Sequence, residues 1–240
     1  MPKKRLLVRT KRKDVSQRLL ESGLRFFALH GFDGATVREI CDDSESNLAA
    51  INYYFKNKLG FFREVCAYGH RLLRERYLKV CEAGENMQPW ERLRKHIEAM
   101  VESAYDSVLR DASWLYMREL MSPQTEPDAE RECANSDHEE MEEQTWRLMS
   151  DLLGAAATRE NIVLLHYTYV SLSLFMIVQQ QVERMSRRES RFGVNVQLEQ
   201  HHLEQYILDI MHNTIERMKK AAAGLRPAGE ADISPAQALH

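Results

Sequence analysis

The amino-terminal end of this chain concentrates positive charge. Residues 1–60 hold 12 Lys and Arg against 7 Asp and Glu, a net charge of +5, and the remainder holds 21 against 29, a net charge of −8. Such a local cationic excess favours binding to a polyanion such as nucleic acid, although a solvated tail is the alternative. Seven of the basic residues lie in the first 13 positions: Lys3, Lys4, Arg5, Arg9, Lys11, Arg12 and Lys13.

Catalytic and metal-binding patterns are not found in the sequence. It has no nucleophile elbow, phosphate loop or metal-binding helix motif, so we predict a protein that is not an enzyme and needs no cofactor. The adjacent His201 and His202 would point about 100° apart on a helix, so we interpret them as solvated surface and predict no metal site. The cysteines are too far apart for a CxxC pair and are interpreted as isolated buried thiols, with redox activity left open: Cys41, Cys66, Cys81 and Cys133.

Composition favours a folded, all-α protein of two units. The 240 residues are 44% hydrophobic and include 10 Gly and 6 Pro, which is few helix breakers for this length. The basic start runs into an amphipathic stretch rather than an apolar signal segment, so we expect a cytoplasmic protein. The longest apolar run, 162–178, is interrupted by polar residues, and we interpret it as a buried helix rather than a membrane span.

Helix signals divide the first 60 residues into three short helices. Apolar residues recur at helical spacing from Asp14 to His30, and Gly31 supplies a stop. Thr36 and Glu39 have the form of a capping box that starts a helix over 37–43. After a polar break, 47–54 can form a third helix of about two turns. Three helices with a tight polar turn predict a helix-turn-helix, whose last helix fits a major groove.

The rest of the chain predicts a larger helical bundle, for about nine helices in total. Asn57 caps a helix over 58–81 that links the two domains. Further helices are expected over 89–109, 112–121, 158–184 and 198–220, with an acidic loop leading into an exposed helix between 122 and 145. The predicted domains are a basic arm (1–13), the helix-turn-helix domain (14–60), a larger helical domain (61–220) and a disordered tail (221–240).

The order of residues in this first domain resembles the TetR family of transcriptional regulators. The pattern runs Phe27-x-x-His30-Gly31-Phe32-x-x-Ala35-Thr36-Val37-x-x-Ile40 and then Ile51-Asn52-Tyr53-Tyr54-Phe55-Lys56-Asn57-Lys58. The segment from Asn47 to Phe55 is most similar to the CecR-like subgroup. The resemblance covers residues 14–62 well; beyond them only Arg118-Glu119, Pro123 and the helical layout fit the subgroup.

The resemblance implies a set of DNA contacts. Ala49 and Ala50 let the third helix approach base edges, and Asn47 and Asn52 can pair with adenine or phosphate. The remaining implied contacts set register on the phosphate backbone, through Thr36, Arg38, Ser46, Tyr53, Tyr54 and Lys58. Core packing is the alternative role for either tyrosine.

Two positions depart from the family pattern. Family members usually have glycine where Glu45 stands and often tyrosine where Asn52 stands. A residue at position 45 is expected to need a positive φ, which costs a residue other than glycine about 1 kcal/mol. Whether Glu45 alters the turn is left open by the sequence.

The resemblance also places an effector pocket in the second domain. The expected ligand-binding residues mix aromatic, thioether and basic side chains: Tyr105, Trp114, Met117, Arg118 and Met121. Arg118 in an apolar stretch would need an anionic or carbonyl-bearing ligand, or else an acidic partner within the bundle. Plain core packing is the alternative for the aromatic and methionine positions.

Wide apolar faces on the last two long helices predict a dimer. An isolated bundle does not need both helices to be so apolar, and pairing with a second copy would bury them. The expected interface residues are Leu172, Phe175, Met176, Tyr206, Ile207 and Ile210.

Together these patterns predict a ligand-responsive regulator that binds double-stranded DNA at a palindromic operator as a homodimer. Repression relieved by a small-molecule effector is the expected mode, without contact to a membrane. The alternative is a helical interaction protein whose basic arm binds a polyanion without sequence specificity.

Overall fold

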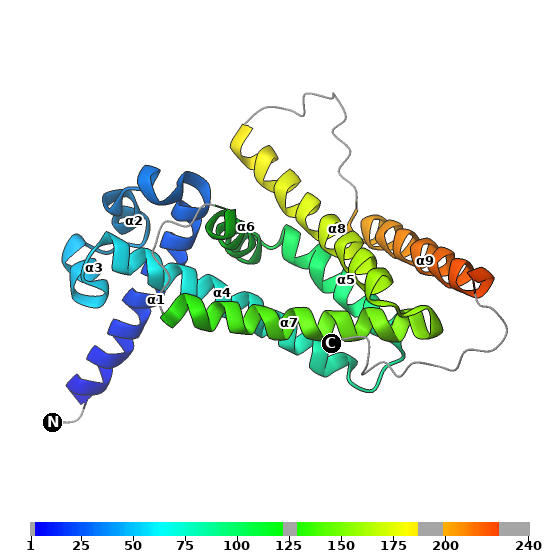
Figure 1. Cartoon of the computed structure of the whole chain (residues 1–240). Helices are drawn as coiled ribbons and strands as arrows, with labels where there is room; N and C mark the ends of the chain where they lie inside the picture. Colours follow the sequence, from blue (N-terminus) through cyan, green and yellow to red (C-terminus); the bar gives the residue numbers. More distant parts are fainter. Residues whose placement is uncertain (1–2, 122–128, 187–198, 226–240) are drawn as a thin grey trace. The chain divides into compact units, whose positions relative to one another are not determined.

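The structure is a computed structural model, and it describes residues 3–121, 129–186 and 199–225 (Figure 1). The described residues form nine α-helices, one short 3-10 turn and no strand, which confirms the all-α prediction. They make two compact units. Of the described residues, the first contains 3–75, 106–121 and 129–135, and the second contains 76–105, 136–186 and 199–225.

Three amino-terminal helices form the frame of the first unit: α1 (Lys3–Gly34), α2 (Val37–Asp43) and α3 (Leu48–Phe55). Helix α1 is interrupted at Gly31, whose φ of 72° and ψ of −179° leave the helical region. The predicted helix end at Gly31 and the bounds of α2 are therefore confirmed. Helix α1 also continues back to Lys3, through the segment that was predicted as an arm.

The core of the first unit joins the three helices to α4 (Lys58–Gly84) and α6 (Ser107–Met121). Phe27 of α1 packs edge-on against Phe62, with ring centroids 4.9 Å apart. Leu115 of α6 is buried in the same core. Helix α6 thus belongs to the unit that holds the short helices, whereas the sequence assigned it to the second domain.

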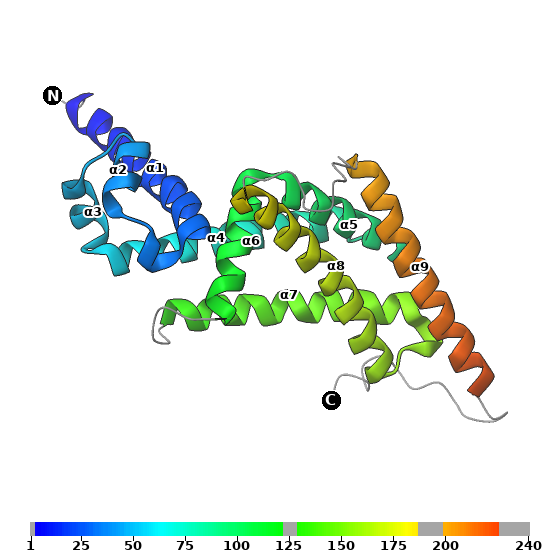
Figure 2. The same cartoon turned by 90° about the horizontal axis from the view of Figure 1, so that it is seen from above.

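The second unit is a bundle of α5 (Pro89–Tyr105), α8 (Arg159–Ser186), α9 (Gln200–Leu225), most of α7 (Ala129–Leu153) and the end of α4. Figure 2 shows α8 and α9 beside α5. The core is built from leucine, isoleucine and methionine side chains that recur at helical spacing, such as Leu93, Ile97 and Val101 on α5. Helix α7 begins at Ala129, inside the acidic segment 122–145 for which the sequence predicted a loop leading into an exposed helix.

Helix α8 departs from the prediction of a buried helix. The segment Arg159–Val182 is long and apolar enough to cross a membrane. Only 17% of the residues in its most apolar stretch are buried within the chain. Five of its large apolar side chains are exposed, and they occupy one helical face: Leu164, Tyr167, Phe175, Val178 and Val182. A buried helix would be covered on all sides, so this apolar face is a surface of the second unit.

Candidate nucleic-acid interface

Helix α3 is held by its apolar side and by a side-chain cap. Ile51 and Phe55 are buried in the core of the first unit, at 1% and 7% exposure. At the other end, the amide of Ala50 donates a hydrogen bond to Asn47 Oδ1 over 3.0 Å. This cap satisfies an amide of the first turn. It leaves the side-chain NH2 of Asn47 to meet an acceptor outside the helix.

The opposite side of α3 carries the predicted base-reading residues. Ala49, Asn52 and Tyr53 are exposed there, and Tyr53 keeps 63% of its surface. Tyr54 is half-buried and packs against the core, with its ring 5.1 Å from that of Tyr53. Tyr54 thus combines a core contact with a partly accessible ring, so the two roles weighed for it in the sequence are both compatible with its position.

The start of α2 presents a capped helix end to solvent. The amide of Glu39 donates to Thr36 Oγ1 over 3.3 Å, and the amide of Thr36 donates to the Glu39 carboxylate over 3.3 Å, which confirms the capping box. The hydroxyl of Thr36 also donates to that carboxylate and lowers the pKa of Glu39. Arg38 is exposed on the same turn. Its guanidinium is free to reach a phosphate oxygen beside the helix start.

Lys58 stands at the first turn of α4. Its Nζ lies 4.7 Å from the centroid of the Phe32 ring. The Gly60 amide donates to Asn57 Oδ1 over 2.8 Å, as the predicted cap requires. The cation–π contact orients the ammonium group without neutralising it, so Lys58 can still attract an anion.

The turn between α2 and α3 adopts the conformation that glycine would provide. Glu45 has a φ of 50°, which is the positive value expected for this position. The Ser46 amide donates to the Cys41 carbonyl over 2.9 Å, and the hydroxyls of Ser44 and Ser46 lie 2.8 Å apart. These bonds keep the turn in place, so Glu45 preserves its geometry at a conformational cost.

We expect Glu45→Gly to raise the free energy of unfolding by about 1 kcal/mol, because it removes the penalty of a positive φ. Urea unfolding measures this change. Glu45→Ala is the matched control, since it removes the same carboxylate but keeps a Cβ, and we expect it to leave stability nearly unchanged. Equal gains in both variants would show that charge, not backbone conformation, limits stability here.

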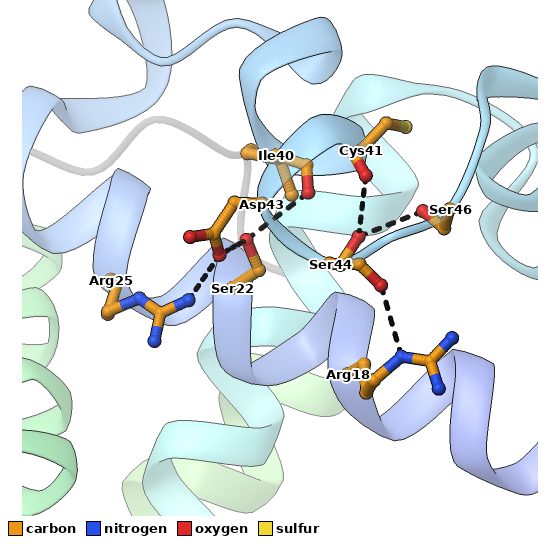
Figure 3. A network of polar contacts seen from close by, with 8 residues as sticks. All are labelled: Arg18, Ser22, Arg25, Ile40, Cys41, Asp43, Ser44 and Ser46. Atoms are coloured by element: carbon orange, nitrogen blue, oxygen red, sulfur yellow. Dashed lines mark hydrogen bonds and ion pairs between the residues drawn. The ribbon is translucent and has the colours of Figure 1, made fainter.

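A polar network fixes the turn to α1 (Figure 3). Arg18 Nε donates to the Ser44 carbonyl over 3.0 Å, and the buried Ser22 hydroxyl lies 2.5 Å from an Asp43 carboxylate oxygen. Arg25 pairs with the same carboxylate. The sequence analysis did not identify this network. Its signal was the spacing of Arg18, Ser22 and Arg25, which are four and three residues apart and so share one helical face.

The structure separates the predicted ligand-binding residues. Tyr105 ends α5 in the second unit, whereas Trp114, Met117, Arg118 and Met121 lie on α6 in the first. Trp114 packs against the core that supports the short helices, and Met121 is exposed. The guanidinium of Arg118 lies over Gly31, where an added Cβ would be 2.2 Å from its Nη2. This position favours a structural role for Arg118, an alternative that the sequence left open.

The predicted dimer residues also divide. Phe175 and Tyr206 are exposed, and Leu172 and Ile210 are half-buried. Met176 and Ile207 instead pack within the core of the second unit, because they lie on the inward sides of α8 and α9. The predicted set did not include the exposed Leu164, Tyr167 and Val182, although their apolar spacing was visible in the same segment.

His201 and His202 lie closer together than the sequence analysis expected. Their ring centroids are 4.0 Å apart, and one ligand atom from each lies within 4.8 Å of the other and of a Glu199 oxygen. All three residues are exposed. They surround the start of α9, where the helix dipole disfavours a cation, so the arrangement carries no metal assignment.

Comparison with known proteins gives two matches that together span both units. Residues 19–65 match the family model described as bacterial regulatory proteins, tetR family. Residues 89–221, more than half of the chain, match the model described as HTH-type transcriptional dual regulator CecR, C-terminal domain. A curated relative, the probable HTH-type transcriptional regulator YttP of Bacillus subtilis, is 40% identical over 51 residues. That match covers 21% of this chain and 25% of the length of the relative.

Solved structures share the fold at low sequence identity. A TetR-family regulator from Streptomyces coelicolor, SCO4454, superposes with a TM-score of 0.61 at 12% identity, over 86% of this chain and 97% of that one. AibR, solved in complex with isovaleryl coenzyme A and operator DNA, gives a TM-score of 0.56 at 14% identity, over 82% and 97% of the two chains. Because these sequence identities are low, the structural similarity shows only that this chain shares the fold, that is, the arrangement of its helices.

Proposed function

This chain belongs to the TetR family of transcriptional regulators and carries a CecR-type carboxy-terminal domain, and from that premise we propose that it is an effector-controlled repressor that binds a palindromic operator as a homodimer. As a member of this family it is a DNA-binding regulator and not an enzyme. The DNA that it regulates would place it in the cytoplasm.

The exposed face of α3 carries this proposal. Ala49 and Ala50 let the helix backbone approach the major groove, and Asn52 offers both an amide donor and a carbonyl acceptor to an adenine edge. Tyr53 and Arg38 are exposed and would bind the flanking phosphates. The buried Ile51 and Phe55 fix the direction in which the opposite side of α3 points.

The exposed apolar face of α8 supports the homodimer. Its side chains, with Tyr206 of α9, would be covered by the same helices of a second copy. A two-fold dimer presents two α3 helices, and two half-sites related by the same symmetry make a palindrome. Association also explains why a helix of this apolar composition lies at the surface of the second unit, without invoking a membrane.

Control by a small molecule is supported by the separation of the chain into two units. The structural neighbour AibR was solved with both isovaleryl coenzyme A and operator DNA. In this chain the effector would act only if it binds the DNA-releasing arrangement more tightly than the DNA-bound one. Our sequence prediction of Tyr105, Trp114, Met117, Arg118 and Met121 as ligand contacts stays a prediction.

Substitution of Asn52 tests the proposal. We expect Asn52→Ala to weaken operator binding by about 1 to 3 kcal/mol per half-site while leaving random duplex almost unaffected, because a paired base contact is lost. The measurement compares affinities for a selected operator and for random duplex of the same length.

Arg38→Ala is the matched control, since Arg38 is expected on phosphate and its loss should weaken binding to both duplexes equally. If the wild-type protein itself bound operator and random duplex with the same affinity, the chain would be a nonspecific polyanion binder, which is the alternative function.

A further inference from the structure

Two hydrogen-bond donors on α7 have no acceptor within the second unit. Nε1 of Trp146 and Oγ of Ser150 are shielded from solvent and make no hydrogen bond with any residue of the described chain. Ser150 is 8% exposed. Four residues apart, the two side chains share one face of α7, about 6 Å apart along the helix axis. A buried polar group without a partner is costly, so native proteins rarely keep two together.

The behaviour of Ser150 is unusual within its own unit. Hydroxyl side chains inside helices commonly donate to the carbonyl four residues earlier. The nearby hydroxyls do so, at 2.6 to 3.0 Å: Ser103 to Ala99, Thr145 to Met141, Thr168 to Leu164 and Ser173 to Tyr169. Ser150 forms no such bond, although the carbonyl of Trp146 is in the equivalent position. Its hydroxyl therefore remains available to a group outside the helix.

Among the described residues, Trp146 has an aromatic neighbour, and the two arginines nearest to this pair in the structure's ion pairs are matched with carboxylates. The Trp146 ring lies 6.0 Å from the ring of His166 in an edge-on arrangement. His166 Nε2 is 3.7 Å from a Glu142 carboxylate oxygen. Of the neighbouring arginines, Arg147 is paired with Glu143 and Arg92 with Asp151.

An anionic ligand here would meet the carboxylate of Glu142 without a dedicated positive partner. Polar groups elsewhere in the bundle are also held neutral. Burial lowers the pKa of His96 to about 4, so its imidazole is uncharged at neutral pH, and burial raises the pKa of Tyr77. This environment disfavours a charged ligand.

We propose that the effector is an uncharged, largely apolar molecule whose hydrogen-bond acceptor binds Trp146 Nε1 and Ser150 Oγ, with its apolar body against the rings of Trp146 and His166. This assignment rests on the proposed function of the second unit as an effector domain, and it names the chemistry of that effector. The site is not the one predicted around Arg118, because Arg118 belongs to the other unit.

Thermal unfolding of the full-length protein without ligand tests whether the Ser150 hydroxyl lacks a hydrogen-bond partner. We expect Ser150→Ala to raise the Tm by about 3 °C, because it removes a buried hydroxyl that has no partner. Ser103→Ala is the matched control, since its hydroxyl is hydrogen-bonded, and we expect an unchanged or lower Tm. A fall in Tm for Ser150→Ala would mean that its hydroxyl is satisfied within the protein, for example by an ordered water, and would overturn the proposal.

Ligand chemistry is tested with two dyes in a variant that keeps Trp146 as its only tryptophan, Trp90→Phe/Trp114→Phe. Nile red is uncharged and carries a carbonyl, whereas 1-anilinonaphthalene-8-sulfonate is anionic. We expect saturable quenching of Trp146 emission by Nile red, at least tenfold weaker binding of the anionic dye, and about a tenfold loss of Nile red affinity on adding Ser150→Ala. Ser103→Ala in the same background should change neither affinity.

Absence of saturable quenching by Nile red, equal binding of both dyes, or an unaltered affinity in the Ser150→Ala variant would each overturn this site. Operator affinity of the same variants, measured without dye, reports separately on the proposed function. If the protein binds operator normally but does not bind the dye, the proposed ligand site is wrong and the proposed function still stands. Loss of operator specificity in the wild-type protein would remove the proposed function instead.

Discussion

Phe175→Glu is expected to convert the protein from dimers to monomers and to reduce operator affinity at least 100-fold. Phe175 is 68% exposed in the isolated chain and lies in the middle of the apolar face of α8. In a dimer a carboxylate at that position would be buried without a partner, at a cost of several kcal/mol. Operator affinity falls because a monomer can bind only one half-site. Sedimentation velocity and operator titration measure the two effects.

Leu120→Glu is the matched control for this substitution. Leu120 is also apolar and 50% exposed, but it lies on α6 in the first unit and is not part of the proposed dimer face on α8. We expect this variant to remain dimeric with unchanged operator affinity. A Phe175→Glu protein that stayed dimeric and bound operator normally would exclude the face of α8 as the interface.

Gly31→Ala is expected to destabilise the DNA-binding unit by about 1 to 3 kcal/mol, because its φ of 72° and ψ of −179° lie in a region that residues with a Cβ rarely adopt. The new Cβ would also displace the guanidinium of Arg118. Gly31 ends α1 just before α2, so the strain acts on the spacing between these two helices. Urea unfolding and operator titration of the purified protein measure the loss of stability and its effect on DNA binding.

Two further variants separate the causes. Gly34→Ala adds a Cβ that would meet only His30 Cβ, at 3.4 Å, and has no positive φ to oppose it, so we expect little change. Gly31→Ala/Arg118→Ala removes the collision but keeps the backbone conformation, and most of the destabilisation should remain. Full recovery in the double variant would mean that the guanidinium, rather than the backbone, decides the requirement for glycine.

The helix-turn-helix could be predicted closely from the sequence because its determinants are local. The reciprocal bonds of Thr36 and Glu39 join residues three apart, and the cap formed by Asn57 likewise depends on its immediate neighbours. The positive φ of Glu45 was expected because members of the family usually have glycine at that position. The candidate DNA face of α3 was implied by the resemblance to the family, and Ala49, Asn52 and Tyr53 on it are exposed.

Contacts between distant segments were decided by the tertiary structure. Packing of α6 into the first unit placed Arg118 against Gly31, 87 positions earlier in the sequence. The hydrogen bonds and the ion pair between α1 and the turn after α2 likewise join residues that are far apart in the sequence. A residue pattern shows that such a side chain needs a partner, but not which segment will supply it.

The burial of side chains on α8 and α9 could likewise be predicted only in part from the sequence pattern, because it also depends on how the helices pack. The sequence identified two apolar helices, and their periodicity defined candidate faces, but Phe175 and Met176 are neighbours with opposite environments. Which of them turns outward depends on how α8 is rotated against α5 and α9, and that rotation is set by the combined packing of all three helices. The sequence by itself therefore determined most of the helices and the caps formed by Thr36 and Asn57, because these depend on hydrogen bonds and periodicity over a few residues, and the family resemblance implied the candidate DNA face. The tertiary structure alone decided which apolar residues of α8 are exposed, and that Trp146 Nε1 and Ser150 Oγ are shielded without an acceptor among the described residues, because both outcomes depend on side chains far away in the chain.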